Sequence, residues 1–481
     1  MKGFGFSLAD NTYLREDPDG WFLISRVPLR ILRVNQSLFE LLKHLREGGE
    51  LSGFVSRNHG SDEGGLLRVL LPLVSRGYLK LDRIAELKDY PFVSIIIPVR
   101  DQPADLAECL ESLSKLNYPK ARLEVIVVDD GSQSDIFQGV HSDVRVIRQT
   151  ESQGASASRN TGAENARGDI LAFLDADCVA HEDWLREIIP FLKASTVGAV
   201  GGHVDSHYKN SYLDRYEEVS SSLNMGRRLL LEGDTESNFY VPTANIIITR
   251  EVFMATGGFK EEMHVGEDVD FCWRMRNLGY TLLYVPYGRV AHKHRNQLGK
   301  MLRRRVDYGT SEASLYRAHR DKKKRFLMSA YSGLSFLALA LSFLLVNPYP
   351  LVLILPLFGF DLLHKSGTLR KCKMALPLRQ TAYATVRSYI SFYYFVFFHL
   401  IRYYLILMFG LGFLLHSIWF FCGLALFLTS IVDYYVKKPK LPYPVFLFFY
   451  TLEHLAYQAG VFWGCLKLKY FRSYIPAFKH A

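Results

Sequence analysis

The stretch Asp169-Ile-Leu-Ala-Phe-Leu-Asp-Ala-Asp-Cys178 decides how the rest of this chain is interpreted. Its apolar run has the length of a buried strand and ends in two carboxylates, Asp175 and Asp177. Side chains two residues apart on an extended chain point the same way, so this pair can hold one hard divalent cation where open α/β sheets bind ligands. The alternative is a strand end whose solvated acids cap a helix near His181.

Composition indicates several domains, one of them in a membrane. In 481 residues, 49% are hydrophobic and 14% aromatic, which is rich for a soluble protein. Residues 1–19 carry charges and no apolar core, so we expect no signal peptide there. Six cysteines form no Cys-x-x-Cys pair, which favours a reducing compartment and argues against disulfides or structural zinc. They are Cys109, Cys178, Cys272, Cys372, Cys422 and Cys465.

The sequence pattern of residues 1–88 predicts a small α+β module. Strands are expected at Trp21–Ile24 and Leu29–Val34, helices at Gln36–Arg46 and Gly64–Arg76, and a final strand at Tyr78–Asp82. This order resembles the winged-helix modules related to peptide chaperones, which implies capture of a peptide by addition to a sheet edge.

Two other roles for residues 1–88 are a structural appendage and a DNA-binding winged helix. The module holds 13 Lys and Arg against 11 Asp and Glu, a balance of +2. That charge is too small to drive binding to nucleic-acid phosphates, so we expect no nucleic-acid partner.

After a polar link, the chain alternates strands and helices. Val93–Val99 is a nearly continuous β-branched run, as in a buried parallel strand, and Leu123–Ser132 predicts a second buried strand that ends in two acids and a tight turn. A helix is expected between them at Leu106–Leu116. Val144–Arg148 predicts a third strand and Ala155–Ala166 a helix. This pattern is typical of a nucleotide-binding α/β half.

Five short strings in this region carry a family resemblance. They are Ser94-Ile-Ile-Ile-Pro98, Val128-Asp-Asp-Gly-Ser132, Ser158-Arg-Asn-Thr-Gly162, Asp175-Ala-Asp177 and Gly266-Glu-Asp268. Each is weak alone, but in this order they resemble the family 2 glycosyltransferases of the GT-A fold. The resemblance covers residues 92–305 and implies an α/β GT-A nucleotide-diphospho-sugar transferase domain between the winged-helix-like module and a membrane region.

The resemblance implies a UDP-sugar donor and roles for particular residues. Asp130 would accept a hydrogen bond from the imide nitrogen of uracil, and Pro98 and Arg100 would line the base pocket. Arg159 would lie near the base or diphosphate; the alternative is an arginine on a helix surface.

For the divalent metal, Mg²⁺ or Mn²⁺, we expect Asp177 as a ligand, while Asp175 contacts the ribose or supports the metal. His292, in Val290-Ala-His-Lys-His294, is a candidate third ligand. The alternative for His292 is a solvated basic loop.

The acceptor side is expected in the second half of the domain. Gly201 and Gly202 lack side chains that would keep a sugar from the backbone, and Glu267 and Trp273 flank the same region. By the family motif, Asp268 is the general base that takes the proton of the acceptor hydroxyl, although acids in a first helical turn also serve as caps. One displacement inverts the anomeric centre.

The C-terminal part predicts a membrane region. A juxtamembrane segment, 306–325, is basic: Met301–Arg325 holds nine Lys and Arg against three Asp and Glu. Residues 326–481 predict four to five hydrophobic helices. Apolar stretches stand at Phe326–Val346, Leu351–Leu363, Tyr389–Met408, Leu411–Ile431 and Tyr443–Leu466, the last interrupted by Glu453 and His454. The basic segment favours a multi-pass protein of the cell membrane with a cytoplasmic catalytic domain.

Two classes of function fit these features: a membrane-anchored glycosyltransferase, and a binding scaffold whose transferase domain no longer turns over. Within the first, the combination of modules resembles the glycosyltransferases of mycofactocin biosynthesis, which implies glucose transfer to a peptide-derived redox cofactor. The alternative acceptor is a membrane lipid or a cell-envelope polysaccharide. The Gln-x-x-Arg-Trp string of processive synthases is absent after His294, which argues against long-chain synthesis.

Overall fold

The computed structural model describes residues 3–51, 53–54, 63–87, 89–133, 135–136, 144–194, 196–371, 374 and 376–480. Lys88, the expected end of the first module, and Cys372 lie outside these residues. The chain divides into two compact units: Met1–Leu23 with Leu32–Arg295, and Ile24–Ile31 with Asn296–Ala481.

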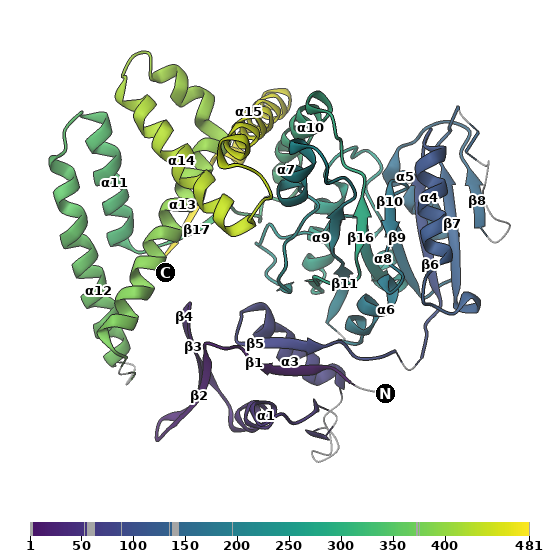
Figure 1. Ribbon diagram of the computed structural model, residues 1–481, viewed down its shortest axis with the longest axis horizontal. Coiled ribbons are helices and arrows are strands. Elements are labelled where there is room, and N and C mark those ends of the chain that lie inside the picture. The colour runs from purple at the N-terminus through teal and green to yellow at the C-terminus, as the bar shows by residue number, and fades with distance from the viewer. Residues whose placement is uncertain are drawn as a thin grey trace. The chain divides into compact units, whose positions relative to one another are not determined.

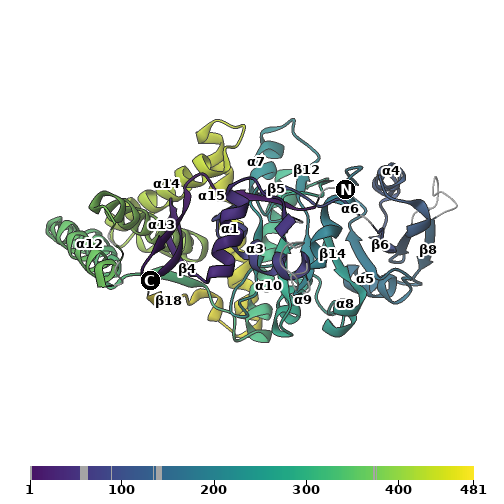
Figure 2. The ribbon, with the colours of Figure 1, turned by 90° about the horizontal axis from the view of Figure 1, so that it is seen from below.

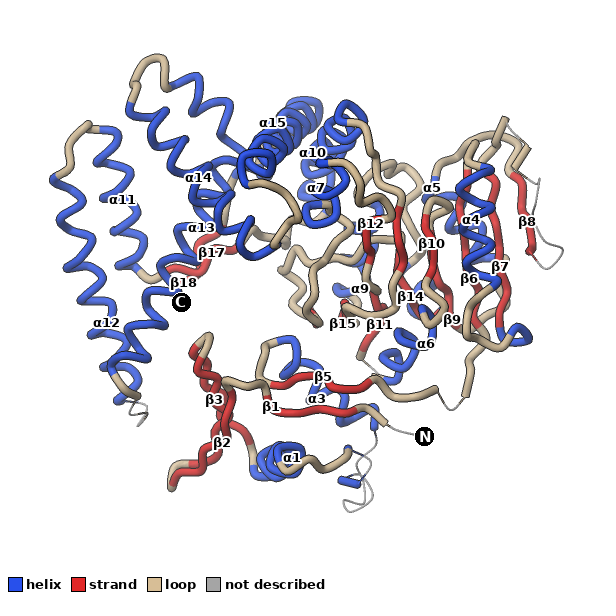
Figure 3. Tube along the Cα trace, in the orientation of Figure 1, coloured by secondary structure: helices blue, strands red, loops and turns tan. Residues whose placement is uncertain are grey.

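An eight-stranded sheet forms the centre of the first unit, with the strand order β13-β15-β11-β14-β9-β6-β7-β8 (Figure 3). Strands β6 to β9 are mutually parallel, β14 runs antiparallel to β9 and β11, and β13 runs antiparallel to β15. The bounds are β6 Val93–Val99, β7 Leu123–Asp129, β8 Val144–Arg148, β9 Ile170–Leu174, β11 Val197–Gly201, β13 Leu230–Glu232, β14 Asn245–Thr249 and β15 Thr281–Tyr284.

Helices cover both faces of this sheet (Figure 2). α4 and α6 lie on one face, and α5 and α8 on the other, so β6 and β9 are buried on both sides, as their apolar runs require. The bounds are α4 Pro103–Ser114, α5 Ala155–Glu164, α6 Trp184–Ile188, α7 Tyr212–Ser220, α8 Arg250–Thr256 and α9 Glu267–Asn277, with 3₁₀ turns at Lys120–Arg122 and Ile189–Lys193.

A second, three-stranded sheet stands beside the end of β9. Its order is β10-β16-β12, with β10 Cys178–Ala180, β12 Val204–Ser206 and β16 Val290–His292. β16 pairs antiparallel with β10 and parallel with β12. This sheet therefore brings residues near 177, 206 and 292 to one place.

The first residues form a small module with the expected helices and strands, plus two strands that sequence patterns did not indicate. β1 Gly5–Leu8 pairs with β5 Leu79–Arg83, and β2 Thr12–Asp17, β3 Gly20–Arg26 and β4 Leu29–Val34 form a three-stranded sheet. α1 is Gln36–Arg46 and α3 is Glu63–Ser75. Phe4 packs on Phe191, and Leu231 N donates to Ser75 Oγ at 2.9 Å, so the module shares a core with the central sheet.

The second unit is mainly helical (Figure 1). Its helices are α10 Leu298–Ala318, α11 Ala330–Leu344, α12 Ile354–Lys371, α13 Leu378–Leu411, α14 Ser417–Lys437 and α15 Tyr443–Leu468. β17 Arg325–Met328 pairs in parallel with β18 Ala477–His480, and 3₁₀ turns occupy Tyr349–Leu353 and Arg472–Tyr474.

Within the described ranges, three helical stretches are long and apolar enough to cross a membrane: Tyr349–Lys371, Leu378–Leu411 and Ser417–Lys437. The predicted span at Phe326–Val346 is wrong in its limits, because β17 takes its first residues and α11 is only 15 residues long. The expected short piece at Leu351–Leu363 belongs instead to a stretch of 23 residues.

α10 and α15 pack closely through small residues and buried charges. A Cβ atom at Gly460 would collide with the carbonyl oxygen of Val306 on α10. Glu453 of α15 is 3.6 Å from Arg305 of α10 and 3.3 Å from Arg402 of α13. The charges that interrupt this apolar stretch are thus partners within the unit.

Candidate active site

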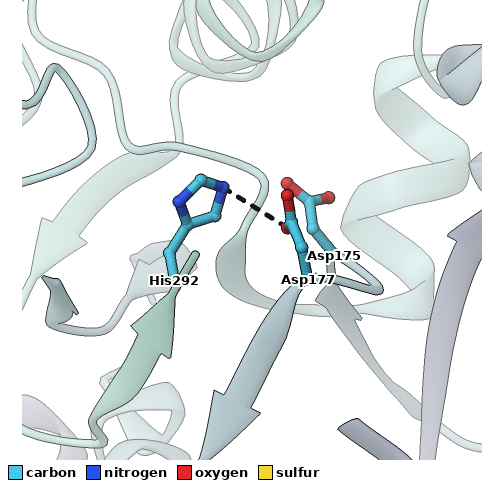
Figure 4. Close-up of side chains that lie close together, drawn as sticks. All are labelled: Asp175, Asp177 and His292. Atoms are coloured by element: carbon cyan, nitrogen blue, oxygen red, sulfur yellow. Dashed lines mark ion pairs between the residues drawn. The ribbon is translucent and has the colours of Figure 1, made fainter. Parts of the chain in front are cut away.

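Asp175, Asp177 and His292 come together just beyond the carboxyl end of β9 (Figure 4). The two aspartates occupy the turn between β9 and β10, and the pairing of β10 with β16 sets Cys178 opposite His292. One ligand atom from each of the three side chains lies within 4.8 Å of the others. His292 Nε2 is 3.3 Å from Asp177 Oδ1, and both side chains are shielded from solvent.

This cluster fits a divalent cation. Asp177 is only 8% exposed, and apart from the ion-pair contact with His292 its buried Oδ1 accepts no hydrogen bond from the described residues. Burial raises the pKa of Asp177 above its ordinary value. His292 lowers this pKa and the charge of Asp175 raises it, but burial is the largest effect. A bound cation offsets the free-energy cost of burying a charged carboxylate. Carboxylate oxygens are ligands that Mg²⁺ and Mn²⁺ prefer.

The geometry adds Asp175 to the two expected ligands. Sequence analysis assigned the metal to Asp177 and His292 and placed Asp175 at the ribose or in a supporting role. In the structure one carboxylate oxygen of Asp175, one of Asp177 and one ring nitrogen of His292 all lie within 4.8 Å of one another. All three metal assignments stay predictions.

Arg159 connects this cluster to α9. Its side chain, on α5, is 4% exposed, which excludes the surface alternative. Nη2 donates to Asp175 Oδ1 at 2.7 Å, and Nη1 donates to Glu267 Oε1 at 3.0 Å. Burial by itself lowers the pKa of the guanidinium, but Asp175 and Glu267 hold it above its ordinary value. Arg159 is therefore a fixed cation between two carboxylates.

Asp268 lies in the first turn of α9, where the chain turns at Gly266 with a φ of 84°. A positive φ is easily adopted only by glycine, so this residue sets the start of the helix. Asp268 Oδ1 accepts a 2.8 Å hydrogen bond from Val269 N, and its charge acts on Arg159. Glu267, expected on the acceptor side, pairs with Arg159. Its acceptor-side role stays a prediction.

Asp130 is buried at the end of β7 and organises the loop that leads into α5. Its carboxylate accepts hydrogen bonds from Gln153 N at 2.7 Å, Gly154 N at 3.1 Å and Ser152 Oγ at 2.8 Å. Arg100 Nη1 donates to the same Ser152 oxygen at 2.8 Å. Pro98, on β6, pairs with Val128 of β7. The expected base-pocket residues are thus gathered around one loop.

Packing accounts for the two glycines that were expected to admit an acceptor sugar. A Cβ at Gly201 would meet Val241 at 2.6 Å, and one at Gly202 would meet Asn245 and Ile188 at 2.5 Å. Trp273 is buried on α9. Their acceptor-side role stays a prediction.

Two neighbours of His292 were not singled out from the sequence, although the His-Lys-His string contains them. Lys293 Nζ pairs with Asp105 at 2.8 Å and Glu108 at 2.5 Å on α4. His294 Nδ1 is 2.8 Å from Ser206 Oγ, and its Nε2 is 3.1 Å from Asp214 Oδ1. These contacts hold the end of β16, and so His292, in place.

A central mixed sheet, paired acids beyond a central strand and a helix that starts with Glu267 and Asp268 are the arrangement expected of a glycosyltransferase with the GT-A fold. The profile of "Glycosyl transferase family 2" matches residues 94–257. A relative shares 34% identity over 70% of this chain and 68% of its own length; it is the "Pre-mycofactocin glycosyltransferase" of Mycobacterium tuberculosis. The chain belongs to glycosyl transferase family 2, is a glycosyltransferase, and has the GT-A arrangement of its sheet.

Other known proteins are similar over smaller parts or at lower identity. "Glycosyltransferase AglE" of Haloferax volcanii is 31% identical over 51% of this chain and 82% of its own length. Among solved structures, the "Mannosyltransferase PcManGT from Pyrobaculum calidifontis in complex with GDP-Man and Mn2+" is 18% identical, with a TM-score of 0.41 over 68% of this chain and 96% of that one.

Proposed function

We propose that this family 2 glycosyltransferase moves a hexose, glucose in our assignment, from a UDP-sugar to a peptide-derived redox cofactor of the mycofactocin type. One observation carries the catalytic part of the proposal. Asp175, Asp177 and His292 lie together, and Arg159 links them to the helix that bears Asp268. The acceptor is supported by the 34% identity to the "Pre-mycofactocin glycosyltransferase" and by the peptide-chaperone-like module.

For the donor, we assign the uracil to Asp130 and the surrounding loop. The two oxygens of a carboxylate offer about four acceptor positions. Three donors of residues 152–154 make four contacts with them, because Gly154 N contacts both oxygens. A uracil imide N–H therefore needs one donor to give way. Ser152 Oγ is the one that can rotate its hydrogen away, because the others are backbone groups, and the hydrogen bond that it accepts from Arg100 would hold its oxygen in place.

For the chemistry, we assign a single displacement. Asp268 takes the proton from the acceptor hydroxyl as its oxygen bonds to the anomeric carbon, and the bond from that carbon to the diphosphate breaks. An α-linked donor then gives a β-glycoside. Asp175, Asp177 and His292 would hold a divalent cation, which would stabilise the charge of the departing diphosphate. Arg159 keeps the Asp175 carboxylate oriented through its 2.7 Å hydrogen bond.

We also propose that the protein is anchored in the cell membrane with its catalytic domain on the cytoplasmic side. The three long apolar helical stretches support the anchoring. The excess of Lys and Arg in Met301–Arg325 supports the orientation, since basic segments beside membrane spans favour the cytoplasm.

The test is a panel of UDP-sugars offered with a mycofactocin-type acceptor, with product mass as the readout. We expect the acceptor to gain hexose units from UDP-glucose, in a reaction that stops when the metal is chelated. Transfer only to a lipid or polysaccharide acceptor would replace the acceptor assignment. Failure to bind UDP with any divalent metal would instead identify a binding scaffold without turnover.

A further inference from the structure

A small basic cavity lies in the second unit, beside α13: Lys324 Nζ, in its wall, is 3.8 Å from the centre of the Tyr403 ring. Its volume is about 130 Å³, and about 10–15 Å³ suffices for one water molecule, so it admits a group of several atoms. It is enclosed by the end of α10, the segment that follows it and the segment before β18. Its lining residues are Tyr316, Lys322, Lys323, Lys324, Arg472, Ile475, Pro476 and Ala477.

The walls of this cavity are held by specific contacts. Ala477 N donates to Lys324 O at 2.8 Å, and the pairing of β17 with β18 starts at Arg325 and Ala477. Lys324 Nζ pairs with Glu312 Oε2 at 3.0 Å and donates to Ser473 O. Tyr470 OH donates to Tyr316 O at 3.0 Å. These contacts join residues 316–325 to residues 470–477 on both sides of the cavity. The cavity is therefore held open by specific contacts within this unit.

The lining has one sign of charge. Four cationic side chains, Lys322, Lys323, Lys324 and Arg472, line the cavity, and none of its lining residues is acidic. Two carboxylates stand behind them: Asp321 is 3.0 Å from Lys322 Nζ, and Glu312 pairs with Lys324. With two carboxylates against four cations, the surroundings of the cavity keep a net positive charge, which favours an anion within it. Phosphate has the size and the acceptor oxygens for several cationic donors.

Apolar side chains adjoin the basic lining. Ile475 lines the cavity and is 68% exposed, and Phe471 and Phe478, which flank the same segment, are also exposed. β17 continues through Ser329, the N-cap of α11, into the apolar helices, and in Figure 1 it lies beside α13. Basic and apolar side chains side by side are suited to the boundary between headgroups and acyl chains.

We propose that this cavity binds the phosphate of an anionic membrane lipid, with Lys323 and Arg472 as its outer ligands and Ile475 against the acyl chains. The site lies outside the transferase unit and does not depend on the assignments of donor and acceptor.

The test uses the full chain in nanodiscs of phosphatidylglycerol or of phosphatidylcholine, with thermal unfolding and native mass spectrometry as readouts. We expect wild type to unfold at a higher temperature in phosphatidylglycerol and to retain at least one such lipid in the mass spectrum. The double variant Lys323→Gln, Arg472→Gln should lose the retained lipid and most of that temperature difference. Lys322 and Lys324 are left intact because they hold the fold.

A matched variant is Arg370→Gln, Lys371→Gln, which removes two charges from the end of α12, outside the cavity lining. It should keep both the retained lipid and the temperature difference. Equal losses in the two double variants would overturn the site, since general attraction to the surface would then explain them. Stabilisation of the detergent-solubilised protein by inorganic phosphate, equal to that by phosphatidylglycerol, would overturn the lipid as the ligand.

Discussion

The guanidinium of Arg159 donates a 2.7 Å hydrogen bond to Oδ1 of Asp175 in the interior of the transferase domain. The same guanidinium donates at 3.0 Å to Glu267, the neighbour of Asp268 on α9. One side chain thus fixes the distance between the acids beyond β9 and the first turn of α9. In the proposed mechanism, those are the places where the donor phosphates and the acceptor hydroxyl meet.

We predict that Arg159→Lys lowers kcat about 10- to 100-fold while the protein stays folded. Lysine keeps the charge but not the planar fork, so one hydrogen bond to a charged group is lost, worth about 1.5–3 kcal/mol. Arg159→Met should also lower the free energy of unfolding by about 3 kcal/mol, because two carboxylates lose their buried partner. Steady-state kinetics and denaturant unfolding measure the two effects.

The control for Arg159 is Arg186→Lys. Arg186 is an exposed partner of Asp183 on α6, at 3.3 Å, and its replacement should change stability by less than about 0.5 kcal/mol. If Arg159→Lys behaved like this control in both assays, the link between the two halves of the site would have no role in turnover.

We predict that Asp177→Ala removes the metal dependence of UDP binding. Wild type should bind UDP much more weakly after EDTA treatment than with Mn²⁺, whereas the variant should show the weak affinity in both conditions. Isothermal titration calorimetry measures this without turnover. Asp183→Ala, which removes a carboxylate from the protein surface, should behave as wild type; an unchanged metal dependence in Asp177→Ala would remove Asp177 from the ligands.

We predict that Asp268→Asn lowers kcat by about 10²–10⁴-fold and leaves the affinity for UDP-sugar within about threefold. A general base contributes about that much to the rate, and asparagine is nearly isosteric. If Asp268 were only a helix cap, asparagine would replace it and activity would survive. A parallel loss of donor affinity would place Asp268 at the metal instead.

The stereochemistry of the wild-type product tests the same assignment independently. A single displacement from an α-linked donor gives a β-glycoside, which the anomeric coupling constant in the NMR spectrum identifies. An α-linked product would contradict a single displacement with Asp268 as base, whatever the variant did.

We predict that Gly460→Ala destabilises the helical unit by about 1–3 kcal/mol. The added methyl group would press against the Val306 carbonyl on α10, where the two helix backbones are in contact. Gly423→Ala is the control, because its Cβ on α14 meets nothing within 4 Å and alanine favours helix. Thermal unfolding in detergent compares them; equal melting temperatures would show that α10 and α15 tolerate separation.

The sequence by itself determined several strands and helices. In the transferase domain, Val93–Val99 and Val144–Arg148 are strands with the expected limits, and in the first module Gln36–Arg46 is a helix with the expected limits. These elements follow from local hydrophobic periodicity, which is written in consecutive residues. The ordered motifs also led to the family, which the match over residues 94–257 and the 34% identical relative confirm.

Only the tertiary structure decided which side chains meet. The sequence of its own helix does not show that the Arg159 side chain is buried. That burial depends on α9, which follows more than a hundred residues later in the chain. Glu453 interrupts an apolar stretch, and in the structure it forms ion pairs with Arg305 and Arg402 of two other helices. Ion pairs and close backbone contacts depend on how strands and helices cross, and hydrophobic periodicity contains no record of those crossings.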